Sequence, residues 1–82
     1  MRELVLYAQH GDAAFLIERN DDGIFLYSRL SSGSLADTWH QSLNDAKAQA
    51  NYDANGTVGP WAEVTDALKA ELTAKFKLRG LD

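Results

Sequence analysis

Three side-chain types that can form a hydrolase triad stand close together in the chain: Asp37, His40 and Ser42. In such a triad a carboxylate orients a histidine, which takes a proton from the serine nucleophile. The three side chains must converge from separate directions. On an extended segment Asp37 and His40 face opposite sides, and Ser42 is better suited to cap a helix. We therefore predict no catalytic residues and no enzyme activity.

A carboxylate and an imidazole can also hold a metal ion. The histidines are His10 and His40, and neither has the HxH, HxxxH or HxxE spacing that preorganises ligands. The chain has no cysteine and no glycine-rich phosphate-binding motif. We expect no metal site and no cofactor. A small-molecule or metal-responsive subunit that uses Asp37 and His40 is kept as an alternative function.

Length and composition indicate one small soluble domain. The chain has 82 residues, of which 45% are hydrophobic and 24% charged. This length supports a single core, so residues 1–82 are expected to form one domain. The start lacks an apolar leader, and no apolar run is long enough to span a bilayer. We expect a cytoplasmic protein that does not enter the membrane.

The formal net charge of −4 bears on possible partners. Negative charge repels the phosphate backbone, so DNA or RNA binding is disfavoured. A nucleic-acid-binding accessory role would need Arg19, Arg29 and nearby lysines to gather on one face, and it is kept as the second alternative function. An acidic protein is better matched to basic protein surfaces, because complementary charge speeds encounter.

Residues 37–54 mark the point where the hydrophobic period changes from that of a strand to that of a helix. Ser42 can accept the free N–H groups of a helix start, and Asp45 favours the positive end of the helix dipole. We therefore expect the sheet to end near His40 and a helix to begin at Leu43. Its alanine stripe, which includes Ala46, would let it pack closely on one sheet face.

The first half of the chain reads as strands separated by turns. Asn20-Asp21-Asp22-Gly23 is the strongest turn signal, because asparagine and aspartate favour early turn positions and glycine tolerates positive φ. Four strands joined by tight turns predict an antiparallel meander, with an edge strand free to pair with its copy in a dimer. The predicted strands are residues 3–9, 13–19, 24–30 and 35–40, and the first and last of these are the candidate edges.

The segment after Pro60 allows two interpretations. Residues 61–64 alternate like a short edge strand, with Thr65 capping a following helix; alternatively, Pro60 is the first residue of that helix. We favour the strand. In both cases residues 66 to about 77 form a helix with the apolar stripe Leu68, Leu72 and Phe76, which Gly80 ends.

Large amphipathic side chains are enriched at binding hot spots, so they are the candidate partner-binding residues. The simplest role for Trp39 and Trp61 is still the hydrophobic core, because these are the largest side chains of a small domain. Tyr52 lies on the far side of its helix from the alanine stripe. The candidate set for partner binding is Trp39, His40, Tyr52 and Trp61.

The run D-T-W-H-Q-S-L at residues 37–43, followed by Ala46, Gln49, Ala50 and Tyr52, resembles a D-T-W-H-x-S/T-L-x-x-A-x-x-Q-A pattern of small bacterial proteins of unknown function. The resemblance covers roughly residues 23–64. It implies a small α+β domain and brings no reaction, cofactor or partner with it. The last helix lies outside the match.

The sequence thus predicts an α+β fold, in which an antiparallel four- to five-stranded meander has one helix packed on a face and a C-terminal helix follows. We expect a non-enzymatic protein-binding or regulatory domain of the inhibitor or immunity type. Its partner would be another protein or a second copy of the chain.

Overall fold

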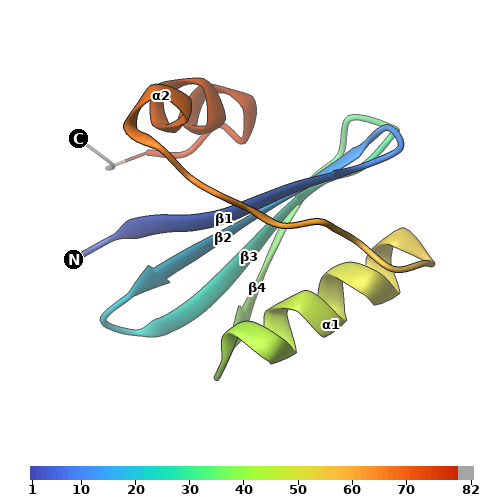
Figure 1. Ribbon diagram of the computed structural model, residues 1–82, viewed down its shortest axis with the longest axis horizontal. Coiled ribbons are helices and arrows are strands. Elements are labelled where there is room, and N and C mark those ends of the chain that lie inside the picture. Colours follow the sequence, from blue (N-terminus) through green and yellow to red (C-terminus); the bar gives the residue numbers. More distant parts are fainter. Residues whose placement is uncertain (80–82) are drawn as a thin grey trace.

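A computed structural model describes residues 1–79, and one antiparallel sheet lies at its centre (Figure 1). The strands lie side by side in the order β4-β3-β2-β1-β5. β-branched and aromatic side chains suit this pleated surface. The first four strands are β1 (Glu3–His10), β2 (Ala13–Asn20), β3 (Gly23–Arg29) and β4 (Leu35–His40). The predicted α+β fold with a meander sheet is confirmed.

The turn between β2 and β3 is closed by its own side chains. It pairs Asn20 with Gly23, and the Asn20 side-chain oxygen accepts a hydrogen bond from the backbone N–H of Asp22 at 2.7 Å. Asparagine suits this position because its side chain imitates a backbone turn. Gly23 has a φ of +137°, which a residue with a Cβ adopts only under strain. These residues therefore fix the register of the hairpin.

The segment after Pro60 forms a short strand, so the favoured interpretation is confirmed. β5 (Ala62–Glu63) pairs antiparallel with Leu6 and Tyr7 of β1. It therefore lies at the opposite edge of the sheet from β4. The candidate edge at residues 3–9 is thus partly covered, because β1 lies between β2 and β5.

The helix predicted at residue 43 is α1 (Leu43–Ala54), and its ends have the expected chemistry. The side-chain oxygen of Ser42 accepts the backbone N–H of Asp45 at 3.1 Å, as in an N-cap. At the other end Asn55 has a φ of +55°, and its N–H donates to the last turn of the helix. The change from strand to helix at Ser42 is confirmed.

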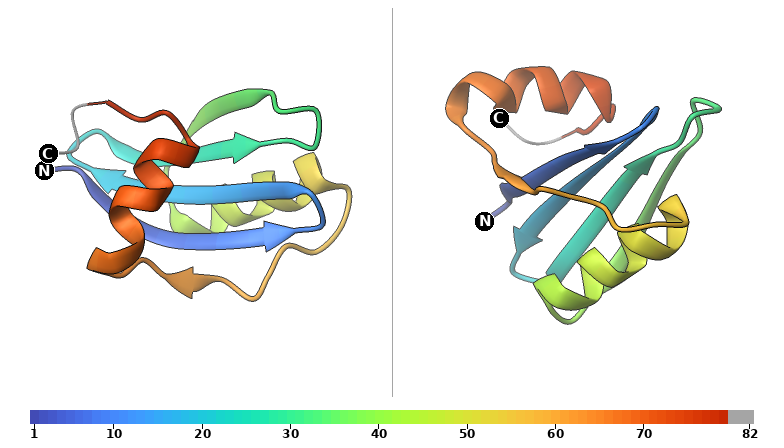
Figure 2. Two further views of the ribbon diagram at one scale, coloured as in Figure 1. Left: turned by 90° about the horizontal axis from the view of Figure 1, so that it is seen from above. Right: turned by 45° about the vertical axis from the view of Figure 1, so that its right-hand side comes forward.

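α1 covers one face of the sheet, which is called the α1 face below (Figure 2). Ala46 and Ala50 are fully buried against this face. Their small side chains let the helix lie close to the strands, which supply the large partners Phe15, Ile17 and Leu26. The predicted packing of an alanine stripe against larger strand residues is confirmed.

α2 (Asp66–Lys75) covers the opposite face, the α2 face, so the sheet lies between two helices (Figures 1 and 2). Leu72 and Phe76 of the predicted stripe are buried there with Leu4 and Leu16 of the first two strands. β2 is consequently covered on both sides. This explains why apolar residues occupy both faces of β2.

The start of α2 agrees with the prediction, but its end does not. Thr65 caps its start, where the side-chain oxygen accepts the backbone N–H of Leu68 at 3.3 Å. The helix ends at Lys75, earlier than the predicted residue 77, because Lys77 takes a left-handed conformation with a φ of +54°. Gly80, which was expected to end the helix, lies outside the described residues.

A β-bulge divides the apolar run of β1 between the two faces. The register with β2 shifts between Leu4 and Leu6, and Val5 is the extra residue. Leu4 consequently packs on the α2 face and Leu6 on the α1 face, whereas a regular strand would place both on one side. The carbonyl oxygen of Val5 accepts the Val64 N–H at 3.1 Å, so the bulge also joins the segment that follows β5.

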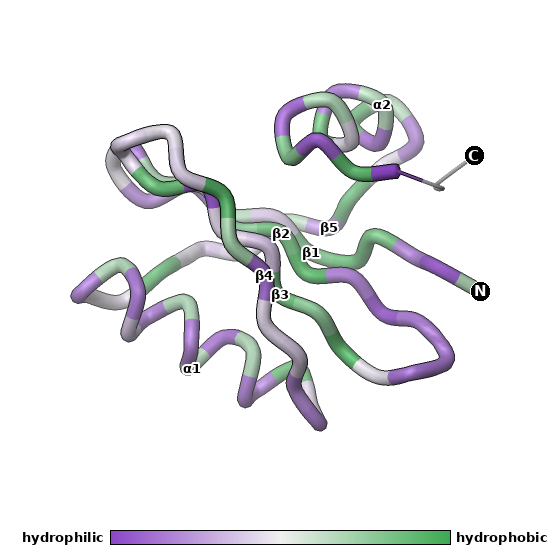
Figure 3. The backbone as a smooth tube through the Cα atoms, turned by 180° about the vertical axis from the view of Figure 1, so that it is seen from behind, coloured by the Kyte–Doolittle hydropathy of each residue, from purple (hydrophilic) through white to green (hydrophobic). Residues whose placement is uncertain are grey.

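Hydropathy is unevenly distributed over the sheet (Figure 3). β1 and β2 contain long hydrophobic stretches, whereas β4 is mainly pale or purple. The residues of β4 up to Trp39 are exposed, while most of β2 is buried. Within residues 1–79, no helix is both long enough and apolar enough to cross a membrane.

Candidate functional site

The four candidate partner-binding residues lie at separate places in the fold. Trp39 and His40 end β4, Tyr52 lies on α1 and Trp61 directly precedes β5. Tyr52 is 82% exposed, whereas Trp61 is partly buried against the hydrophobic cluster under α1. The core role expected for Trp61 is consistent with this position. The four side chains do not form one patch, and β4 carries two of them, Trp39 and His40.

Trp39 lies on the α2 face, opposite Phe25 of β3. The expectation that Trp39 belongs to the core is wrong, because 52% of it is exposed. Its indole N–H donates to the backbone carbonyl of Asp22 at 2.7 Å. The ring therefore lies over the β2–β3 turn instead of entering the core, and Gly23 provides the space for it.

β4 is the free edge of the sheet. It pairs with β3 along its full length, and its other side meets no strand within the described part of the chain. Residues 35–39 are all exposed. An edge of this kind presents a row of backbone N–H and C=O groups to any extended segment that can pair with it. We call the outward side of β4 the β4 edge.

The turn before β4 determines which residues point their backbone groups outward. The backbone N–H of Leu30 donates to the carbonyl of Ser34 at 2.9 Å, so these two residues form a bonded pair. Bonded and non-bonded pairs alternate along an antiparallel ladder. Leu35, Asp37 and Trp39 consequently occupy non-bonded positions opposite β3. Their N–H and C=O groups point away from the sheet and form the β4 edge.

The two sheet edges differ in protection. The edge at β1 is shielded by β5, which contains only Ala62 and Glu63 and presents little backbone of its own. Short strands and charged residues are common means of preventing unwanted pairing. β4 spans six residues and has a single charged side chain, Asp37, in its middle. It is the longer open edge among the strands of residues 1–79.

β4 belongs to an acidic segment of the chain. Residues 21–54, which form β3, β4 and α1, contain five carboxylates and two basic side chains, and so carry −3 of the net charge of −4. The carboxylates are Asp21, Asp22, Asp37, Asp45 and Asp53, all of them exposed. We call residues 21–54 the acidic half.

A groove borders the other end of β4 on the α2 face. It has a volume of about 340 Å³ and lies between β4 and the segment that follows α2. Leu35 and Phe76 give it apolar walls, and Lys77 and Arg79 bring positive charge. Asp37 lines the same groove and lies near these cations, whereas the Trp39 end of β4, beside the exposed Asp22, lies outside the groove.

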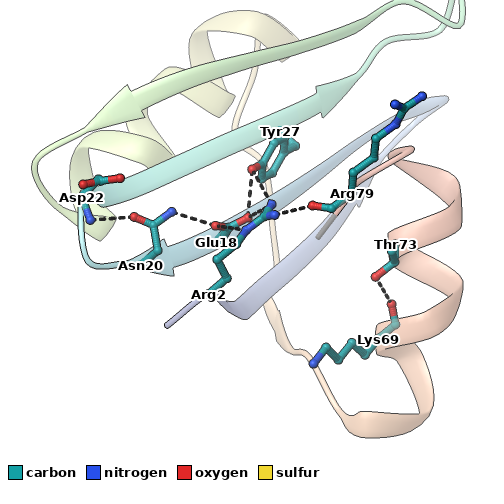
Figure 4. Close-up of polar contacts among 8 residues, drawn as sticks. All are labelled: Arg2, Glu18, Asn20, Asp22, Tyr27, Lys69, Thr73 and Arg79. Atoms are coloured by element: carbon teal, nitrogen blue, oxygen red, sulfur yellow. Dashed lines mark hydrogen bonds and ion pairs between the residues drawn. The ribbon is translucent and has the colours of Figure 1, made fainter. Parts of the chain in front are cut away.

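Glu18 is a buried carboxylate that sequence reasoning did not identify as a polar centre (Figure 4). It is 1% exposed. Its Oε1 accepts from Arg2 Nη2 at 2.9 Å and from the Tyr27 hydroxyl at 2.8 Å, and its Oε2 accepts from Arg2 Nε at 2.9 Å and Asn20 Nδ2 at 2.8 Å. Each oxygen thus has two donors, which satisfies the carboxylate.

The pKa shifts of Glu18 and Tyr27 fit a structural role for this network. Burial alone would raise the pKa of Glu18, but the hydrogen bonds from Arg2, Asn20 and Tyr27 outweigh it, so the pKa is lowered. Burial and the bond to Glu18 raise the pKa of Tyr27 to about 12. At neutral pH the carboxylate stays charged and the phenol stays protonated, so neither group is tuned for proton transfer.

The same network joins the two ends of the described chain. The Arg2 guanidinium, which holds Glu18, also donates through Nη1 to the backbone carbonyl of Arg79 (Figure 4). Arg2 follows the first residue, and Arg79 lies beyond α2. The buried carboxylate therefore fixes the segment after α2, which forms one wall of the groove beside β4.

The residues of the triad and metal alternatives are not brought together. Asp37 lies on the α2 face with Tyr27, its partner in β3, whereas His40 lies on the α1 face beside Thr38, whose Oγ1 is 2.7 Å from His40 Nε2. Ser42 is used as the cap of α1. Across residues 1–79 there is no group of three or more His, Cys, Asp or Glu side chains placed to hold a metal ion.

The basic residues of the nucleic-acid alternative are also separated. The register of β2 and β3 places Arg19 on the α1 face and Arg29 on the α2 face. Arg19 forms an exposed ion pair with Glu3 at 2.7 Å. These two arginines therefore do not form one basic patch.

Comparison with protein-family models, with curated proteins and with solved structures finds no match to this chain.

Proposed function

We propose that this protein is a non-enzymatic protein-binding domain that binds its partner by pairing a strand with the β4 edge. The observation that carries the proposal is the open backbone of Leu35, Asp37 and Trp39, held outward by the register with β3. In strand addition the main-chain hydrogen bonds supply affinity and the alternate side chains supply specificity. β4 offers both.

The surroundings of β4 support a rigid docking edge. α1 packs beneath the strand on one face, and the indole of Trp39 is held to the β2–β3 turn on the other. A prearranged strand loses little conformational freedom on binding. The role that fits is that of a small acidic regulator, of inhibitor or immunity type, in the bacterial cytoplasm. Its partner is another protein or a second copy of this chain.

Site-specific photo-crosslinking in the source cells tests this proposal. A photoreactive amino acid replaces Leu35, which is 40% exposed on β4, and in a separate variant replaces Tyr52, which is 82% exposed on α1. We expect a discrete adduct from position 35 and none of that size from position 52. The adduct should disappear when Asp37→Pro is added, because proline removes an outward N–H.

Two results would contradict the proposal. One is an adduct that forms from position 52 and not from position 35, because the partner would then contact α1. The other is a position 35 adduct that survives Asp37→Pro unchanged, because contact at Leu35 would then not require pairing with the strand.

A further inference from the structure

We infer that the strand received by the β4 edge is an extended segment of a partner protein with Lys or Arg at alternate positions, on the side that faces Asp37 and Trp39. This inference rests on the proposed function and specifies its partner. It follows from the register of β4, from the charges around its Trp39 end and from the open aromatic face there.

The register determines where the side chains of an added strand lie. Side chains directly opposite in paired strands share a face. An incoming segment bonded to Leu35, Asp37 and Trp39 therefore places every second side chain on the α2 face, beside those three. The intervening side chains lie on the α1 face, beside the small or polar Ala36 and Thr38.

Charge selects the residues that face Asp37. Opposite charges directly across a strand pair stabilise the pair, whereas like charges destabilise it. Asp37 is the exposed charged side chain in the middle of β4, where Lys77 and Arg79 line the adjacent groove. The exposed Asp22 adjoins the Trp39 end because its carbonyl accepts from the indole. A lysine or arginine opposite Asp37 gains an ion pair. A glutamate there meets repulsion.

The exposed face of Trp39 favours the same side chains. Trp39 is 52% exposed on the α2 face, because the buried residues of α2 pack on β1 and β2. A cation over an indole ring is attracted by the ring quadrupole, and tryptophan is the strongest aromatic partner for it. A basic side chain next to Asp37 can therefore contact a carboxylate and an indole together.

A second copy of this chain fits less well, on the same argument. Pairing two β4 strands brings together two acidic halves, each with a net charge of −3. Antiparallel pairing centred on Asp37 would place the two Asp37 carboxylates opposite each other. The charge on β4 therefore disfavours the symmetric dimer and favours a basic partner.

The test is an NMR titration of the isotopically labelled protein with two matched peptides. The first is Thr-Lys-Thr-Lys-Thr-Lys-Thr and the second is Thr-Glu-Thr-Glu-Thr-Glu-Thr, both with blocked ends. We expect the lysine peptide to bind at least about tenfold more tightly. The amides of Leu35, Asp37 and Trp39 should gain protection from exchange, whereas those of Ala36 and Thr38, already bonded to β3, should change little.

A protein variant tests the charge separately. Asp37→Asn should weaken binding of the lysine peptide by about two- to fivefold and leave the fold intact, because Asp37 is exposed. Asp12→Asn is the matched control, since Asp12 is an exposed aspartate in the β1–β2 turn. It should leave the affinity unchanged.

Several results would overturn the inference. Equal binding of both peptides at β4 would show that charge does not select the partner. If neither peptide binds at β4 but the position 35 adduct forms and is lost in the Asp37→Pro variant, a basic strand is rejected and the proposed function stands. Concentration-dependent protection of the same amides in the protein alone would identify a second copy as the occupant. Failure of both the titration and the crosslinking would reject the inference and the proposed function together.

Discussion

The indole of Trp39 lies directly against the backbone of Gly23, across the β3–β4 pair. A Cβ added to Gly23 would stand 2.4 Å from Trp39 Nε1, closer than side chains approach. The indole N–H meanwhile donates to the carbonyl of Asp22. Gly23 therefore both forms the β2–β3 turn and leaves the space that the Trp39 indole occupies. The turn and the β4 edge are consequently one structural unit.

Gly23→Ala should destabilise the protein by about 2–4 kcal/mol, because the alanine meets both a strained φ and the indole. Gly33→Ala is the matched control. Gly33 has a φ of +89° but nothing within 4 Å of its added Cβ, so it should lose only about 1–2 kcal/mol from strain. Urea unfolding measures both. Equal losses would show that the indole does not occupy the space over Gly23.

Removing the guanidinium of Arg2 should destabilise the fold by about 2–4 kcal/mol, because Glu18 would stay buried with two of its four donors missing. Arg2→Met keeps much of the side-chain stem. The control is Arg19→Met, which removes an exposed pair with Glu3 and should lose less than about 1 kcal/mol. Comparable losses in the two variants would contradict the structural role assigned to Glu18.

The same network predicts loss of stability in acid. The folded pKa of Glu18 lies below the ordinary value of 4.5, so its contribution is fully present above pH 4.5 and is lost as the pH falls through the lowered pKa. Urea unfolding at a series of pH values measures this. Glu18→Gln should flatten the acid limb, and an unchanged limb would assign the loss to other carboxylates.

In alkali the stability falls as the pH rises, because the pKa of Tyr27 is raised from 10.0 to about 12 in the folded protein. Its contribution is fully present below pH 10.0 and is lost as the pH rises toward about 12, where the folded state also ionises. Tyr27→Phe should reduce this part of the alkaline loss in the same unfolding series. Identical alkaline limbs in the two proteins would contradict it.

Proline substitutions distinguish the two sides of β4. Asp37→Pro removes an N–H that points outward and should lose about 1–2 kcal/mol, mostly from the fixed φ. Thr38→Pro removes an N–H of the ladder with β3 and should lose about 3 kcal/mol or more. Chemical denaturation ranks the two variants. The reverse order would show that the outward residues are Ala36 and Thr38 and would shift the β4 edge by one residue.

Local chemistry explains why much of the fold could be predicted from the sequence. The turns depend on Asn20, Gly23 and their neighbours, and the start of α1 depends on Ser42, so each is determined within a few residues. The strand at residues 61–64 is favoured on similarly local grounds, because these residues alternate and Thr65 can cap the helix that follows. These are the features for which neighbours in sequence are also neighbours in space.

Long-range contacts account for what was missed. An apolar run such as residues 4–7 does not show where a bulge changes its face, because either face accepts it. Glu18 shares a side with Ala14 and Leu16, which signals a buried acid, but its partner Arg2 is far away in sequence. The exposure of Trp39 could not be foreseen because it depends on how far α2 reaches over the sheet.

The most direct test of the binding edge is hydrogen exchange along β4, in the protein alone and in complex with the partner captured at position 35. Alone, the amides of Leu35, Asp37 and Trp39 should exchange quickly, whereas those of Ala36 and Thr38 should be protected by β3. In the complex all five should be protected. Fast exchange at Leu35, Asp37 and Trp39 in the complex, with new protection confined to another element, would contradict binding by strand addition to β4.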